Sequence, residues 1–176
     1  MRAFIARMEM VFVSTADARG NCDCSLRAGP PGFVRAVDAH TLLYPEYRGN
    51  GVMASQGNIT ENGHIGLLFI DFCHSTVGLH VNGRARLLEA ADPDAPRDGE
   101  PSPPNDHGGP PVERWVAVEV DEAYIHCAKH VPLLVRRDKP IAWGTDDERR
   151  KGGDYFGASR TRRGGAPAGA DRPPAR

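Results

Sequence analysis

The sequence lacks the segments that mark secreted and membrane-spanning proteins. No apolar run approaches the ~20 residues that a transmembrane helix needs. Residues 1–13 have apolar character, but charged residues interrupt them and no small-residue cleavage site follows, so we expect no signal peptide and a cytoplasmic location. The four cysteines form no C-x-x-C pair. We therefore expect free thiols and no metal, a zinc site being the less favoured alternative.

An excess of charge of one sign is also missing. Lys and Arg number 22 against 23 Asp and Glu, which gives a formal net charge of -1. Such a chain offers no general attraction to nucleic acid or to an anionic membrane, so any anion must be bound by a local group of Arg side chains and backbone N–H groups. The sequence contains no pair of carboxylates of the kind that would indicate a hydrolase. It also contains no G-x-G-x-x-G motif and no phosphate-binding P-loop.

Two segments have too few apolar residues to form a core. Residues 91–112 are rich in Pro, Gly and charge, which predicts a long exposed loop. Residues 159–176 consist mainly of Arg, Pro, Gly and Ala, which predicts a disordered tail. The remaining pattern predicts one domain over residues 1–158.

Most of this domain is predicted to be β-strand. Alternating, β-branched or strongly apolar segments predict strands at 10–15, 22–26, 33–37, 41–44, 64–72, 77–88 and 113–127. We expect the most apolar of these, 64–72, to be buried on both faces, Gly83 to mark a bulge, and Pro45 to end the strand before it. Helices are predicted at residues 2–9 and 52–59, the second with Asn50 as its N-cap. The sum predicts an antiparallel barrel or sandwich.

The turn before the second predicted helix is a candidate anion site. Arg48, Gly49 and Asn50 lie where the N–H groups and positive end of the helix dipole would point outward, and Arg can bind a phosphate through two hydrogen bonds. Arg27 directly follows the predicted strand 22–26, near the same place. The alternative is an ordinary surface turn with a solvated Arg.

The order of these motifs resembles the pyridoxamine 5'-phosphate oxidase-like family of flavin-binding split barrels. The resemblance covers roughly residues 3–158 and is carried mainly by the segments 22–33, 44–50, 62–69, 81–85, 122–130, 143–147 and 151–157. It implies a mainly β fold, a six-stranded antiparallel split β-barrel with a few short helices. It also implies a homodimer that holds flavin mononucleotide (FMN) in a groove between its subunits.

The resemblance also implies which residues would bind the flavin. They are the strand and turn residues Ser25, Arg27, Tyr44, Pro45, Tyr47, Arg48, Gly49 and Asn50. Tyr44 and Tyr47 would pack on the flavin ring or its ribityl chain. The oxidases that act on pyridoxamine phosphate have different residues in the first strand and in the turn, and their C-terminal Arg-x-His segment is not recognisable here. The sequence therefore does not support vitamin B6 oxidase activity.

These observations favour an FMN-dependent oxidoreductase that acts on a small-molecule substrate. The first alternative is a non-catalytic protein that binds flavin, haem or a deazaflavin, with His80, His126 or His130 as candidate iron ligands. The second is a degenerate member without a cofactor. For the group formed by His126, Cys127, Lys129 and His130, a structural role is favoured, in which Ile125 and Cys127 pack inward while His126 and Lys129 face solvent.

Overall fold

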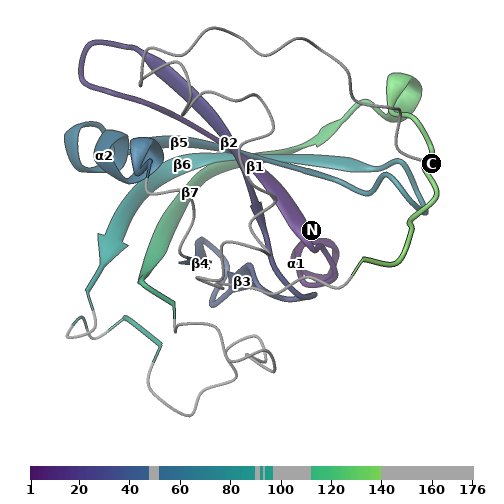
Figure 1. The fold of residues 1–176 in the computed structure, drawn as a ribbon, viewed down its shortest axis with the longest axis horizontal. Helices are drawn as coiled ribbons and strands as arrows, with labels where there is room; N and C mark the ends of the chain where they lie inside the picture. Colours follow the sequence, from purple (N-terminus) through teal and green to yellow (C-terminus); the bar gives the residue numbers. More distant parts are fainter. Residues whose placement is uncertain (48–51, 90–91, 93, 97–111, 140–176) are drawn as a thin grey trace, which may run out of the picture. The chain divides into compact units, whose positions relative to one another are not determined.

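The fold is mainly β, as the sequence predicts. The computed structural model describes residues 1–47, 52–89, 92, 94–96 and 112–139. In chain order the elements are α1 (Arg2–Ile5), β1 (Met10–Ala16), β2 (Cys22–Ala28), β3 (Arg35–Ala36), β4 (Thr41–Glu46), α2 (Ala54–Glu61), β5 (His64–Ile70), β6 (Gly78–Leu88), β7 (Arg114–His126) and a 3₁₀ turn, η1 (Ala128–His130). The strands form one antiparallel sheet in the order β2-β1-β5-β6-β7-β4-β3 (Figure 1). It has seven strands, one more than the family resemblance implies.

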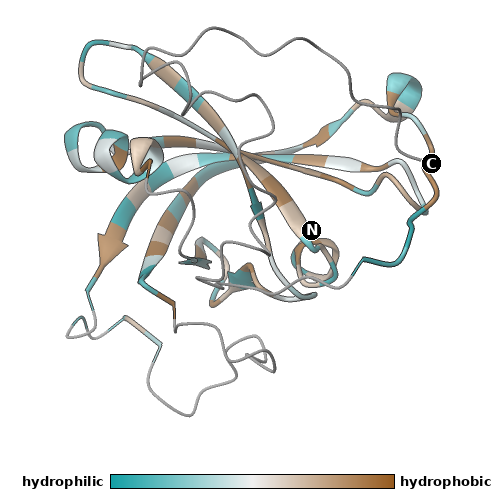
Figure 2. Ribbon diagram, viewed as in Figure 1, coloured by the Kyte–Doolittle hydropathy of each residue, from teal (hydrophilic) through white to brown (hydrophobic). Residues whose placement is uncertain are grey.

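Alternation of side chains along the strands creates the core. Bands of hydrophobic and hydrophilic residues follow one another along the strands (Figure 2). In β5 the buried side chains of Ile65, Leu67 and Phe69 alternate with partly exposed ones. The expectation that this strand is buried on both faces is therefore wrong, because an antiparallel sheet can leave its second face partly open to water.

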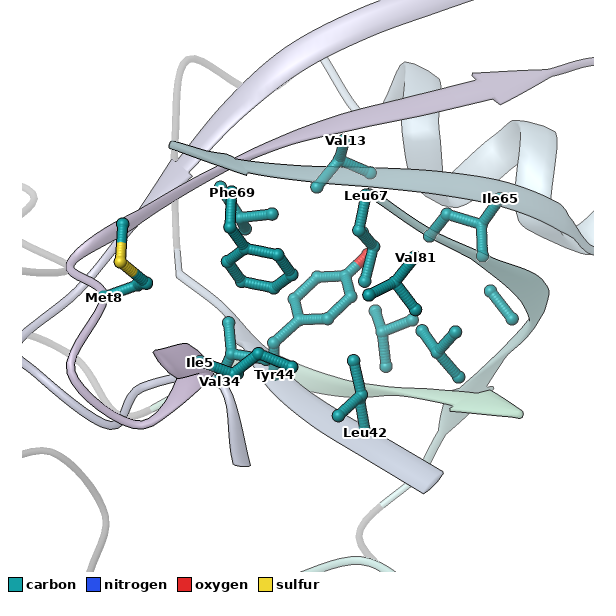
Figure 3. Packing of buried hydrophobic residues seen from close by; sticks show 14 of the residues in the cluster. Ile5, Met8, Val13, Val34, Leu42, Tyr44, Ile65, Leu67, Phe69 and Val81 are labelled. Carbon is teal, nitrogen blue, oxygen red and sulfur yellow. The ribbon is translucent and has the colours of Figure 1, made fainter. Parts of the chain in front are cut away.

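Tyr44 lies at the centre of the main hydrophobic cluster. Its side chain is fully buried and points between Phe69, Leu67 and Val81, with Leu42 beside it (Figure 3). Residues of α1, β1, β4, β5, β6 and β7 contribute to this cluster, so β4 is fixed from one side by the packed interior. The end of β4 is thereby held at a defined place.

Pro45 does not end β4, contrary to the prediction. The strand continues through Glu46, with Pro45 opposite Trp115 and Glu46 opposite Arg114 of β7. Proline lacks the N–H group that donates a hydrogen bond to a neighbouring strand. Because β3 pairs only with Leu42 and Leu43, β4 has a neighbouring strand on just one side at Pro45, so the missing donor is tolerated there. Glu46 therefore lies within the strand, and the strand geometry sets the direction of its side chain.

Helix α1 is shorter than predicted, and α2 begins later in the sequence than predicted. Helix α1 ends at Ile5, and α2 begins at Ala54 with Met53 as its N-cap. The N-cap prediction for Asn50 is therefore wrong, and Asn50 itself lies outside the described residues. The side chain of Met53 makes no capping hydrogen bond to the first N–H groups of α2.

The long β6–β7 ladder contains the predicted irregularity at Gly83. The register shifts between Asn82 and Gly83, because Gly83 pairs with Val120 and Asn82 pairs with Glu122. Asp121 is thus the extra residue of a bulge. Past this point β7 is largely exposed, and Ile125 and Cys127 do not pack inward as expected.

The turn after β5 is organised by the carboxylate of Asp71. This carboxylate accepts hydrogen bonds from the N–H groups of Cys73, His74 and Ser75 and from the Ser75 hydroxyl, the last at 2.7 Å. Burial alone would raise the pKa of Asp71, but the hydrogen bonds from Ser75 and His74 outweigh it and lower the pKa. The ionised carboxylate therefore stabilises the turn.

Replacing Asp71 with asparagine should lower the free energy of unfolding by about 1–3 kcal/mol, because several donors then lose a charged acceptor. The folded-state pKa lies below the unfolded value of about 3.9, so this contribution is present above that value and is lost as the pH falls through the folded pKa. Urea unfolding from neutral to acidic pH checks both effects. An Asp71→Asn variant with the stability and acid sensitivity of the wild type would contradict the prediction.

Two predicted segments fall largely on residues that the structure does not describe. Most of the predicted loop 91–112 and all of the predicted tail 159–176 lie outside the described residues. Across the part of the chain that is described, no helix is both long enough and apolar enough to cross a membrane.

Candidate functional site

Strand β2 carries the polar residues of the candidate site on one face. Its burial alternates, so that Asp23, Ser25 and Arg27 are partly buried while Cys22, Cys24 and Leu26 point to solvent. This alternation places the two cysteines on the same exposed face. Arg27 lies within β2 rather than after it, because the strand extends to Ala28.

Residues of β4 and α2 complete the site opposite that face. The buried polar or charged residues of the described chain are five, and three of them lie here: Glu46, Ser55 and Gln56. Because polar side chains are seldom buried without partners, their concentration at one place marks a built arrangement. We refer to Asp23, Ser25, Arg27, Glu46, Ser55 and Gln56 as the Arg27 cluster.

The centre of the cluster is the ion pair between Arg27 and Glu46. The Nε atom of Arg27 lies 2.9 Å from Oε1 and 3.0 Å from Oε2 of Glu46. The exposed fraction of the side chain is 21% for Arg27 and 4% for Glu46, so the guanidinium reaches water and the carboxylate does not. Burial raises the pKa of Glu46, while Arg27 and a hydrogen bond from Gln56 act in the opposite direction.

A chain of hydroxyl groups extends from the ion pair along β2. Nη1 of Arg27 donates to the Ser25 hydroxyl at 2.9 Å, which lies 3.0 Å from the Ser55 hydroxyl. The Ser55 hydroxyl donates in turn to Asp23 at 2.9 Å. Nη2 of Arg27 makes no hydrogen bond within the described part of the chain, so it is available to a ligand.

The structure brings together only some of the predicted flavin-binding residues. Ser25 and Arg27 are in contact, and Pro45 is buried next to Glu46 at the end of β4. Tyr44 points into the core, so its ring is not on a surface that a ligand could reach. Tyr47 is half-buried, and burial raises the pKa of its hydroxyl. Arg48, Gly49 and Asn50 lie outside the described residues.

Sequence reasoning missed Asp23, Glu46, Ser55 and Gln56. The alternation Asp23-x-Ser25-x-Arg27 is a usable signal, because three polar side chains at spacing two share one face of a strand. Nothing in the sequence signals that Glu46 is buried, since burial depends on how far β4 continues past Pro45.

A second polar group lies on β6 and β7. Nε2 of His80 is 2.9 Å from Nδ1 of His126, and the His80 ring stacks on Tyr124 with centroids 4.7 Å apart. Burial lowers the pKa of His80, and His126 lowers it further. Within the described residues no group of three or more His, Cys, Asp or Glu side chains could hold a metal ion.

Comparison with known proteins identifies the family. The family profile described as pyridoxamine 5'-phosphate oxidase matches residues 1–127. The structure resembles that of HupZ from Group A Streptococcus at 20% identity, with a TM-score of 0.52, covering 71% of this chain and 90% of HupZ. A point variant of the same streptococcal protein has a TM-score of 0.52 at 19% identity, covering 72% of this chain and 96% of the variant. A comparison with curated protein sequences gave no match. The fold and the matched residues together show that this chain belongs to the pyridoxamine 5'-phosphate oxidase family.

Proposed function

We propose that this protein is an FMN-dependent oxidoreductase acting on a small-molecule substrate, with the flavin phosphate bound at the Arg27 cluster. The observation that supports this most strongly is a partly exposed guanidinium beside two hydroxyl groups. A phosphate needs fixed cations and hydrogen-bond donors, and Arg27, Ser25 and Ser55 are of that kind. The first turn of α2, which carries Ser55, adds backbone N–H groups and the positive end of the helix dipole.

The residues at the site supply hydrogen-bond donors of the kind that FMN needs, but the site also contains negatively charged side chains. Arg27 offers Nη2, and the proposed contribution of Arg48, Gly49 and Asn50 comes directly after Tyr47 in sequence. Bound flavin supplies the electron-transfer chemistry, while the protein binds, orients and shields it. The chain therefore needs no acid–base pair of its own at this site. Vitamin B6 oxidase activity is not part of the proposal.

The proposal includes a homodimer with FMN between its subunits. Apolar side chains at the end of β7 and in the segment after it are strongly exposed, with Ile125 at 72%, Leu133 at 65% and Val135 at 92%. Exposed apolar residues that gather in one segment are typical of an interaction surface. A monomer in light scattering, with and without FMN, would contradict this part of the proposal.

Purified protein should bind FMN with a dissociation constant near micromolar and should bind riboflavin, which lacks the phosphate, at least about tenfold more weakly. Arg48→Ala should weaken FMN binding by about 1.5–3 kcal/mol, the range for a hydrogen bond to a charged group. Flavin fluorescence quenching measures all three affinities, with Arg19→Ala in the β1–β2 turn as the matched control. Absence of FMN binding would exclude the flavin function, and equal affinities for FMN and riboflavin would exclude the phosphate site.

The second candidate function is a cofactor-binding protein without turnover, which includes haem and deazaflavin as ligands. One observation favours haem, namely that His80 and His126 form a hydrogen-bonded pair supported by the Tyr124 ring. In a haem titration followed by absorbance, a Soret band that His126→Ala abolishes would support this alternative over the flavin function.

A further inference from the structure

The guanidinium that should attract a phosphate is already occupied by a carboxylate. Both oxygens of Glu46 lie within 3.0 Å of Nε of Arg27, and the carboxylate is nearly inaccessible to water. A ligand's phosphate that approaches Arg27 therefore meets an existing ion pair rather than an uncompensated cation. Counting contacts among the described residues, Nη2 is the guanidinium nitrogen left for the ligand while this pair is intact.

The charges around the ion pair oppose a dianion further. Asp23 is linked to Arg27 through the hydroxyl groups of Ser55 and Ser25, so the cluster holds two carboxylates against one guanidinium. A phosphate dianion at this place would add two negative charges next to a buried negative one. Like charges in close contact strongly favour protonation of one partner.

The surroundings of Glu46 favour its protonation. It faces Arg27 from β2 and Gln56 from α2, with Tyr44 on its own strand and Arg114 opposite it on β7. Glu113, which precedes β7, raises its pKa through charge repulsion, and burial raises it more. A phosphate that took over Arg27 would remove the main group that keeps this carboxylate ionised.

We propose that Glu46 is an internal counter-ion of Arg27, which a ligand's phosphate displaces while Glu46 takes up a proton from solvent. This inference rests on the proposed function, because it places a phosphate at the Arg27 cluster. It makes Glu46 a residue that determines specificity. The carboxylate weakens the binding of phosphate dianions as the pH rises, and it leaves ligands without a phosphate unaffected.

The test compares the wild type with Glu46→Gln, which keeps the shape and removes the charge. At a pH of about 8, Glu46→Gln should bind FMN about tenfold more tightly than the wild type, and the ratio should shrink as the pH falls to about 5.5. Riboflavin affinity should not change. Protonation of the FMN phosphate, whose second pKa is about 6, affects the affinities of both proteins equally, so it cancels in the ratio of their affinities at each pH. Glu122→Gln, a charge removal on β7 away from the cluster, is the matched control and should behave as the wild type.

Inorganic phosphate serves as a second probe that does not depend on flavin. It should raise the melting temperature of Glu46→Gln more than that of the wild type in a buffer otherwise free of phosphate. If neither protein binds FMN but this difference is seen, the flavin function is wrong and the counter-ion role stands. If Glu46→Gln is folded and has the wild-type response to both probes, the counter-ion role is wrong.

Calorimetry on the wild type keeps the inference testable if Glu46→Gln does not fold. FMN binding at a pH of about 8, measured in buffers of different ionisation enthalpy, should show net uptake of protons by the complex. Riboflavin should show none. FMN binding without proton uptake would overturn the proposal.

Discussion

Replacing Gly83 with alanine is expected to abolish the native fold or to lower the free energy of unfolding by at least about 3 kcal/mol. A Cβ atom at this position would lie 2.0 Å from the carbonyl oxygen of Glu119 and 3.2 Å from the Cα atom of Val120. Both are backbone atoms of the neighbouring strand, so no flexible side chain can move aside. The β6–β7 ladder would have to separate at its bulge.

The matched control for this variant is Gly57→Ala in α2. A Cβ atom at Gly57 meets nothing within 4 Å, and alanine favours a helix over glycine. This change should raise the stability by about 0.5–1 kcal/mol. Chemical denaturation monitored by circular dichroism measures both variants. If Gly83→Ala unfolds at the same denaturant concentration as the wild type, the close approach of the two strands at the bulge is wrong.

Gly83 also shows why much of this fold could be predicted from the sequence. Alternation within a strand is a local property, and a glycine inside an alternating segment indicates a bulge wherever the partner strand comes from. The strands β1, β2, β6 and β7 are accordingly found close to their predicted limits. The prediction for Pro45 is wrong because the effect of a proline depends on its neighbours: a strand paired on one side tolerates a proline that a central strand does not.

The candidate site was less predictable than the fold. Arg27 and Ser25 could be selected from the resemblance, but their partner Glu46 is distant in sequence and is buried only because β4 continues past Pro45. Tyr44 shows the reverse case. Its polar tip suggests a ligand contact, yet its ring fills the core, and its buried hydroxyl has no hydrogen-bond partner within the described chain. Residue type alone does not distinguish these environments, because they are set by contacts between distant strands.

Removing the cation of the Arg27 cluster should have the second large effect. Arg27→Ala leaves the Glu46 carboxylate buried without its ion-pair partner, which should lower the free energy of unfolding by about 3 kcal/mol at neutral pH. Arg136→Ala breaks the exposed pair of Arg136 with Glu9 and should cost less than about 1 kcal/mol. Urea unfolding of both variants gives the comparison.

The pH dependence of the Arg27→Ala variant identifies the cause of its instability. Without Arg27 the folded-state pKa of Glu46 rises further above its unfolded value of about 4.3. The protonated form then stabilises the fold below that unfolded value, and this stability is lost as the pH rises through the folded pKa. The deficit against the wild type should therefore shrink in acid, and Arg27→Ala/Glu46→Ala should recover part of it at neutral pH. A deficit that is independent of pH and unaffected by the second substitution would indicate lost packing instead.

The two ends of one ion pair should therefore behave differently. Arg27→Ala removes both the partner of a buried charge and the cation that receives a phosphate, so stability and FMN affinity should fall together. Glu46→Gln leaves a guanidinium that still reaches water, so it should cost less stability while it increases FMN affinity. If both substitutions weakened FMN binding equally, the ion pair would be only a structural support for the site. Opposite signs would show that Glu46 competes with the ligand for Arg27.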